Sequence, residues 1–286
     1  MSEKSELQAS EASIAVHWQE EELVYPSPQF IAQANMVDPD VYNRFSLENF
    51  PNCFKEYADM LDWYEYWHTI LDTSDAPCWK WFAGGRINAS YNCVDRHLAK
   101  NKNKTAIHFV PELEEEKVEH ITYQELYVRV NEFAALLRDF AGLKAGDRVT
   151  LHMPMSVELP ITMLACARLG VIHSQVFGGF SGRASADRIV DSQSRVLIIM
   201  DSYYRAGNLL NHKENADTAC GLAEKDGQKV DKVLVWQRYP GKASSPTPMV
   251  EGRDYFVNDV LKEYYGRRVD PVPMPAEDPL FLMYTS

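Results

Sequence analysis

A glycine-rich turn carries the clearest chemical signal in the sequence. Residues 171–176, which we expect to form a strand, lead directly into the segment Phe-Gly-Gly-Phe-Ser-Gly at positions 177–182. Where a strand passes through small residues into a helix, a ligand can approach the backbone, and the amide groups at the helix N-terminus favour phosphate. We therefore expect this turn to lie against a ligand that carries phosphate.

Two interpretations of the turn follow from the residues alone. In the first, Gly178, Gly179 and Gly182 only shape a tight turn. In the second, Gly179 and Gly182 match the last two glycines of the G-x-G-x-x-G motif and Asp201 ends the next expected strand, as in a Rossmann-type protein that binds NAD or NADP. Phe177 stands where that motif has its first glycine. The bulky ring at this position disfavours a cradle for pyrophosphate.

Two other groups of polar residues attract attention but have simpler explanations. Cys78, Cys93 and His97 could be imagined as metal ligands, yet the sequence contains no C-x-x-C pair and offers no fourth ligand. Asp95, Arg96 and His97 stand together without a nucleophile beside them. We predict buried structural cysteines, a hydrogen-bonded structural cluster at a helix start, and no metal site.

From residue 105 onward the pattern alternates strands with helices. Thr122 and Glu125 form a capping box before an apolar helical periodicity, and Pro160 and Gly170 suit the first turn and the end of the next helix. Strands separated by helices of about ten residues or more pair in parallel through right-handed crossovers. The predicted fold class is α/β with a doubly wound, mostly parallel sheet. The expected strands are 105–110, 118–122, 148–153, 171–176, 196–200, 232–236 and 280–284, and the expected helices are 123–140, 157–169, 181–192 and 213–226.

The first hundred residues have a different character. They are rich in Trp, Tyr and Asn, and large apolar side chains recur at three- and four-residue steps between residues 54 and 71. That spacing predicts a helix that docks on a larger domain. The expected organisation is therefore an irregular, partly helical N-terminal region over residues 1–100 and an α/β subdomain over residues 101–286.

Composition excludes several classes of function. The 286 residues are 45% hydrophobic and carry a formal net charge of -12 without any basic block, which argues against nucleic-acid binding. Residues 1–13 lack an apolar signal segment, and no run of about 18 apolar residues occurs. The five cysteines are too scattered for a disulfide framework. We expect a soluble, cytoplasmic protein with neither nucleic-acid nor membrane partners.

Several motifs, in a fixed order, give the sequence a family resemblance. The residues from about position 50 to the end resemble AMP-forming acetyl-CoA synthetases, a family of acyl-adenylate-forming ligases, over their N-terminal portion. The resemblance is carried by Lys80-Trp81-Phe82, Asn88, residues 92–98, Met153-Pro154-Met155, residues 163–170, residues 177–181, Asp187-Arg188-Ile189, Ser194-Arg195 and residues 282–286.

This resemblance adds a third interpretation of the glycine turn. It implies a ligase that converts ATP and acetate to an acyl-adenylate and pyrophosphate, after which the coenzyme A thiolate releases acetyl-CoA and AMP, with Mg²⁺ as cofactor. The CoA nucleotide would lie against Phe177, Gly178 and Gly179, and Arg205 would meet its phosphates. Asn208 stands where the family commonly has a second arginine, and an amide brings no charge.

The end of the sequence matches the opening of the family's phosphate-binding loop. Thr285 and Ser286 correspond to its first hydroxyl residues, which hold ATP phosphates together with backbone amides. The resemblance therefore implies an incomplete adenylate-forming large domain, truncated at this loop and inactive alone, with no residue assigned a catalytic role. A chain carrying the missing part is one expected partner. The alternatives are a non-catalytic module that binds CoA or a nucleotide and the NAD(P)-binding protein considered above.

Overall fold

The computed structural model describes residues 25–34, 38–242 and 246–284. The chain divides into two compact units, Met1–Cys53 and Phe54–Ser286. In the first unit, the hydroxyl of Ser27 accepts a hydrogen bond from the Phe30 amide at 3.2 Å and so caps a short helix. The helices of this unit are α2 (Pro28–Gln33) and α3 (Val41–Arg44), and a 3₁₀ turn, η1 (Asn52–Phe54), leads into the second unit.

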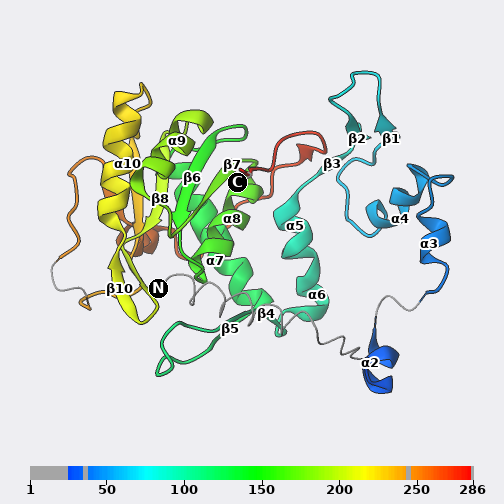
Figure 1. Ribbon diagram of the computed structural model, residues 1–286, viewed down its shortest axis with the longest axis horizontal. Helices are drawn as coiled ribbons and strands as arrows, with labels where there is room; N and C mark the ends of the chain where they lie inside the picture. The colour runs from blue at the N-terminus through cyan, green and yellow to red at the C-terminus, as the bar shows by residue number, and fades with distance from the viewer. Residues whose placement is uncertain (1–24, 35–37, 243–245, 285–286) are drawn as a thin grey trace, which may run out of the picture. The chain divides into compact units, whose positions relative to one another are not determined.

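A six-stranded sheet in which all paired strands are parallel forms the centre of the second unit (Figure 1). The strand order is β12-β11-β8-β6-β7-β14, so the chain enters near the middle and extends the sheet in both directions. This arrangement confirms the predicted doubly wound, mostly parallel α/β fold. The strands are β6 (Arg148–Met153), β7 (Ile172–Phe177), β8 (Val196–Met200), β11 (Lys232–Trp236), β12 (Asp254–Phe256) and β14 (Phe281–Leu282).

The central strand β8 shows why the sheet needs helices on both faces. All five of its residues are buried; Val196, Ile198 and Met200 pack into one hydrophobic cluster while Leu197 and Ile199 pack into another. Because successive side chains of a strand point to opposite faces, each face must be covered. Helices α7 (Tyr123–Asp139) and α8 (Glu158–Leu169) supply the first cluster, and α9 (Gly182–Ser192) and α10 (Lys213–Lys225) supply the second.

The ends of these helices follow the signals in the sequence. Thr122 and Glu125 make the predicted capping box at the start of α7. Ser181 caps α9 by accepting a hydrogen bond from the amide of Ala184 at 3.3 Å. Gly170 ends α8 with φ at 70°, a left-handed conformation that glycine adopts without steric cost. These local interactions fix where each crossover begins and ends.

The order of the strands in the sheet creates a crevice in which we expect a ligand. From β6 the chain crosses through α8 to β7 on one side, and then through α9 to β8 on the other side of β6. Connections that leave neighbouring strands in opposite directions open a crevice at the carboxyl ends of those strands. The glycine turn at the end of β7 lies at this edge.

One prediction for the N-terminal region is wrong. The expected helix over residues 54–71 is limited to a single turn, α4, after which the chain becomes irregular and enters a strand. The Tyr64 amide donates to the carbonyl of Arg86 at 2.8 Å, a partner far along the chain. Trp63 and Trp67 pack against Phe82, with ring centroids 5.9 and 5.5 Å apart. The helical spacing of these aromatic residues therefore does not reflect a helix. Contacts with residues farther along the chain hold this segment in an irregular conformation.

The remaining elements of the second unit are short. A hairpin of β4 and β5 confirms the predicted strand pair around the acidic loop, whereas β12 and a second hairpin, β9 and β10, were not predicted. Within the described residues no helix is long and apolar enough to cross a membrane. The elements are α4 (Lys55–Ala58), β1 (Thr69–Asp72), β2 (Lys80–Ala83), β3 (Arg86–Ile87), α5 (Ala89–Cys93), α6 (Leu98–Asn101), β4 (Thr105–Phe109), β5 (Glu119–Thr122), β9 (Ser202–Arg205), β10 (Asn208–Asn211), α11 (Val257–Val260) and β13 (Met274–Pro275), with 3₁₀ turns η2 (Asp95–His97) and η3 (Leu261–Tyr264).

Candidate functional site

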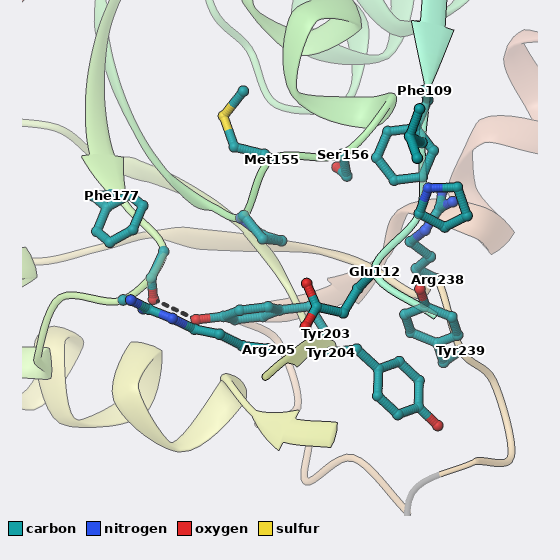
Figure 2. A pocket seen from close by; sticks show the side chains of 15 residues that line it. Phe109, Glu112, Met155, Ser156, Phe177, Tyr203, Tyr204, Arg205, Arg238 and Tyr239 are labelled. Atoms are coloured by element: carbon teal, nitrogen blue, oxygen red, sulfur yellow. Dashed lines mark hydrogen bonds between the residues drawn. The ribbon is translucent and has the colours of Figure 1, made fainter. Parts of the chain in front are cut away.

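A cavity of about 410 Å³ opens at the carboxyl ends of the parallel strands (Figure 2). Its walls come from the segments that follow β4, β6, β7, β8 and β11, so five separate loops converge on it. Aromatic side chains and two arginines dominate the lining. The lining residues are Phe109, Val110, Pro111, Glu112, Pro154, Met155, Ser156, Phe177, Gly178, Gly179, Tyr203, Tyr204, Arg205, Arg238 and Tyr239.

The glycine turn forms one wall of the cavity. Two of its positions, 178 and 179, leave no room for a side chain. A Cβ on Gly178 would lie 3.0 Å from Pro154 Cα and 3.2 Å from the carbonyl oxygen of Met153, both of them backbone atoms. A Cβ on Gly179 would collide with the guanidinium of Arg205 and come within 2.8 Å of the Phe177 ring. The turn thus brings bare backbone to the cavity, as its sequence suggested.

Arg205 reaches this turn from an unpredicted hairpin. It ends β9, and the two-residue loop Ala206-Gly207 connects it to β10 with φ at 48° and 74°, as in a type I′ turn. The Arg205 guanidinium carbon lies 5.3 Å from the centroid of the Phe177 ring. The Gly207 amide donates to Glu112 at 3.2 Å, which ties the hairpin to the loop after β4. Phe177, Gly178, Gly179 and Arg205 therefore meet at one site.

The charge of Arg205 is available to a ligand. Its side chain is exposed, and no carboxylate forms an ion pair with it in the described part of the chain. Asn208, its register partner across the hairpin, donates from its side-chain amide to the carbonyl of Ala206 at 3.1 Å. Asn208 thus stabilises the turn and brings no second charge to the cavity.

Arg238, the other arginine of the cavity, is neutralised by carboxylates. Its side chain is 12% exposed and lies 2.6 Å from Glu119 and 3.4 Å from Glu158, while its guanidinium stacks 4.4 Å above the Phe109 ring. Burial works to lower the pKa of Arg238, but the two carboxylates outweigh it and raise this pKa. Sequence reasoning missed Arg238, although its place directly after the predicted strand 232–236 was an available signal.

Three tyrosines of the cavity were also missed. The hydroxyl of Tyr203 donates to the carbonyl of Gly178 at 3.0 Å, the bond that Figure 2 marks with a dashed line. The rings of Tyr204 and Tyr239 meet edge to face with centroids 4.9 Å apart. Aromatic walls with a few polar groups are typical of small-molecule sites. The consecutive tyrosines just before Arg205 were the signal that could have revealed them.

The structure gives Asp201 a role other than contact with a ribose. Its carboxylate is buried and accepts hydrogen bonds from the Ser202 amide at 2.6 Å and from Thr247 at 3.1 Å. Position 182 has no room for a side chain next to α10, because a Cβ on Gly182 would come within 2.8 Å of the carbonyl oxygen of Asn215. Neither residue lines the cavity, which disfavours the interpretation as a dinucleotide-binding site.

The other polar candidates are structural. Asp95 forms a bidentate ion pair with the buried Arg168, at 2.8 and 2.9 Å, and Arg96 donates to the carbonyl of Met60 at 2.8 Å, as the predicted structural cluster requires. In the described ranges no group of three or more His, Cys, Asp or Glu side chains could hold a metal ion. Cys78 and Cys93 are exposed, so the prediction that they are buried is wrong. Thr285 and Ser286 lie outside the described residues.

Comparison with known proteins gives this site a family context. Residues 94–286 match the family model of the AMP-binding enzymes, and residues 40–93 match that of the acetyl-coenzyme A synthetase N-terminus. The chain is 44% identical over 268 residues to a 3-hydroxypropionyl-coenzyme A synthetase of Sulfurisphaera tokodaii, covering 90% of this chain and 39% of that protein.

Two bacterial acetyl-coenzyme A synthetases give a similar result. The protein of Wolinella succinogenes is 41% identical over 93% of this chain and 40% of its own length, and that of Marinobacter nauticus is 42% identical over 92% of this chain and 40% of its own length. The chain thus spans about two fifths of the length of these relatives. The AMP-binding model alone matches well over half of the 286 residues, so the chain belongs to the family of AMP-binding enzymes.

Proposed function

We propose that this chain is the N-terminal portion of an AMP-forming acetate-CoA ligase and that its cavity binds the nucleotide end of coenzyme A. One observation carries the proposal: the unpaired guanidinium of Arg205 stands against the bare backbone of Gly179 and the ring of Phe177. A guanidinium suits phosphate oxygens through charge-assisted bonds. The glycines admit a ligand to the backbone, and the aromatic wall suits a purine ring.

The proposed reaction has two steps. ATP and a carboxylic acid give an acyl-adenylate and pyrophosphate, and the CoA thiolate then attacks the acyl carbon so that AMP leaves. Acetate is the proposed acid because the Wolinella and Marinobacter relatives are acetyl-coenzyme A synthetases. The Sulfurisphaera relative is named for a different acyl group, 3-hydroxypropionyl. Mg²⁺ would accompany ATP, and Thr285 and Ser286 would begin the loop that holds the ATP phosphates.

We also propose that residues 1–100 form an N-terminal region and residues 101–286 an α/β subdomain. The two family models meet between residues 93 and 94. The remainder of a complete ligase site would come from sequence beyond these 286 residues or from a partner chain. The proposed compartment is the cytoplasm, in keeping with five cysteines that are all free.

Calorimetric titration of the purified chain with CoA tests the proposal. Arg205→Ala should weaken CoA binding about 10-fold to 100-fold, because a charged hydrogen bond to phosphate contributes about 1.5–3 kcal/mol. Arg183→Ala is the matched control: Arg183 is equally an exposed arginine, but it pairs with Asp187 and Asp226 and does not line the cavity. Its CoA affinity should equal that of the unmodified chain.

The same titration separates the competing functions. If the unmodified chain binds NAD but not CoA, the Rossmann-type interpretation replaces this one. If CoA binds equally well to the Arg205→Ala and Arg183→Ala variants, the assigned site is wrong.

A further inference from the structure

Three buried side chains, each in contact with the next, form a column that ends at the glycine turn. Tyr203 donates its hydroxyl proton to the carbonyl of Gly178 at 3.0 Å. Its ring meets that of His212 edge to face at 5.4 Å, and Nε2 of His212 lies 3.1 Å from Nε2 of His152. The exposed fractions are 8% for Tyr203, 1% for His212 and 0% for His152. The column thus runs from the cavity wall into the interior of the sheet.

The hydrogen-bond partners assign the protons in this column. Nδ1 of His212 lies 3.1 Å from the carbonyl oxygen of Met200, so it carries a proton and donates. Because burial lowers the pKa of both histidines, that of His152 to about 3, each ring is neutral. Nε2 of His212 must then accept, and Nε2 of His152 must donate to it. Nδ1 of His152 has no hydrogen-bond partner.

The three side chains of the column come from different segments of the chain. His152 belongs to β6, Tyr203 to β9, and His212 precedes α10. The Tyr203 hydroxyl contacts the turn after β7 directly, while its ring contacts that of His212, which in turn contacts that of His152. Removal of the His152 ring leaves Nε2 of the buried His212 without its hydrogen-bond partner and disturbs the packing on which the Tyr203 ring rests.

We propose that Tyr203, supported by His212 and His152, is a positioning residue for the ligand-binding turn. Its hydroxyl holds the Gly178 carbonyl toward the interior and keeps that oxygen's partial negative charge away from the phosphates of the ligand. The glycine backbone is then presented to the cavity in one conformation, and less ordering is needed when CoA binds. This inference rests on the proposed function, since CoA is the ligand that it concerns.

Amide hydrogen exchange in the ligand-free chain tests the positioning role directly. The Phe180 amide donates to the Phe177 carbonyl at 2.9 Å and reports on the turn. Tyr203→Phe should speed exchange at Phe180 about 5-fold to 10-fold, the effect of losing one ordinary hydrogen bond. Amides of β8 should exchange as before, which a general loss of stability would not allow. Tyr255→Phe is the matched control and should change neither, because the Tyr255 hydroxyl also donates to a glycine carbonyl, that of Gly252 at 3.1 Å, but does not line the cavity.

The histidine pair supplies a second pair of variants. His152→Gln retains an amide donor near the position of Nε2, whereas His152→Leu removes it. His152→Leu should reproduce the faster exchange at Phe180, and His152→Gln should restore most of the protection. Equal exchange at Phe180 in these two variants overturns the supporting role of the pair.

Titration with CoA then connects the turn to the ligand. Tyr203→Phe should weaken CoA binding about 5-fold to 10-fold, and Tyr255→Phe should bind as the unmodified chain does. Unchanged exchange and unchanged affinity in Tyr203→Phe overturn the inference and leave the proposed function standing. Failure of the unmodified chain to bind CoA overturns the proposed function instead, and the exchange data still decide whether Tyr203 holds the turn.

Discussion

The two glycines of the cavity wall differ at the scale of single residues. Gly178 faces the backbone of Met153 and Pro154, which cannot move without disturbing the end of β6. Gly179 faces the far end of the Arg205 side chain, which is flexible. The first glycine is therefore needed for the fold at this edge, and the second is needed for the position of the Arg205 guanidinium, which we propose binds the ligand.

Because of this difference, an alanine should reduce stability at position 178 and CoA binding at position 179. Gly178→Ala should lower the free energy of unfolding by about 1–3 kcal/mol, because overpacking forces backbone shifts. Gly179→Ala should cost little stability, but it should displace Arg205 from Phe177 and weaken CoA binding. Urea unfolding and CoA titration on both variants check this, and the prediction fails if Gly179→Ala proves the less stable of the two.

A buried histidine outside the cavity makes stability depend on pH. Burial lowers the pKa of His173 from 6.5 to about 4, and neither of its ring nitrogens has a hydrogen-bond partner. The unfolded chain therefore binds a proton that the folded chain excludes, and the free energy of unfolding decreases as pH falls from about 6.5 toward 4. By pH 5 this one group should account for a loss of about 2 kcal/mol.

Replacing His173 with phenylalanine tests this assignment. The ring stacks on Phe281 with centroids 5.8 Å apart, so an aromatic substitute preserves the packing. Urea unfolding of His173→Phe at pH 7 and pH 5 should show a pH-dependent loss about 2 kcal/mol smaller than in the unmodified chain. An identical loss in both proteins would assign the effect to other groups.

At the scale of elements, a buried ion network holds the edge strand β12 against α10. Lys213 Nζ lies 2.8 Å from Asp254 and 2.6 Å from Asp217, and the side chains of Lys213 and Asp254 are both fully buried. Burial works to raise the pKa of Asp254, but hydrogen bonds from Arg253 and Lys213 outweigh it and lower this pKa. The carboxylate therefore stays ionised and keeps its partner paired.

Breaking this pair should be costly. Asp254→Asn removes one of the two carboxylates that pair with the buried Lys213 ammonium, leaving only Asp217, and should lower the free energy of unfolding by about 3 kcal/mol. The double variant Lys213→Met with Asp254→Asn should recover part of that loss, because no buried charge remains. Urea unfolding of both variants measures the difference; a double variant less stable than the single one would contradict the explanation.

Elements with a strong local pattern could be predicted from the sequence, and elements fixed by distant contacts could not. The apolar run at 196–200 and the capping box at Thr122 allow few alternatives, and both were confirmed. The β9–β10 hairpin was missed because its turn is Ala206-Gly207, with alanine at a positive φ where Asn or Gly is usual. The aromatic segment after residue 54 follows contacts with Phe82 that no local periodicity reveals.

The residues of the candidate site likewise differ in whether a local sequence signal could reveal them. The glycine turn has a local signal, and the family resemblance supplied Arg205. Arg238 and Tyr239 come to the cavity only because β11 pairs with β8, and strand order is not written in any local motif. The roles of the four residues proposed to bind CoA stay predictions until ligand binding is measured.

At the scale of the whole molecule, the chain spans about two fifths of its relatives. For the described residues that line the cavity we propose roles in binding and positioning, and no catalytic role. We expect the 286-residue polypeptide alone, given ATP, Mg²⁺ and acetate, to release no pyrophosphate above background. The full-length Wolinella succinogenes enzyme is the positive control, and acetate-dependent pyrophosphate release by the pure polypeptide would contradict this expectation.

The convergence of five loops on one cavity has an evolutionary consequence. Each loop begins where a different strand ends, and the strands are held by packing that does not involve the cavity. Substitutions in one loop can therefore alter one wall while the others keep their shape. Met155, for example, lines the cavity with an 80% exposed side chain and could be exchanged without changes to the glycine turn. Such an arrangement lets selectivity diverge by independent small steps, and it offers directed evolution separate regions to randomise.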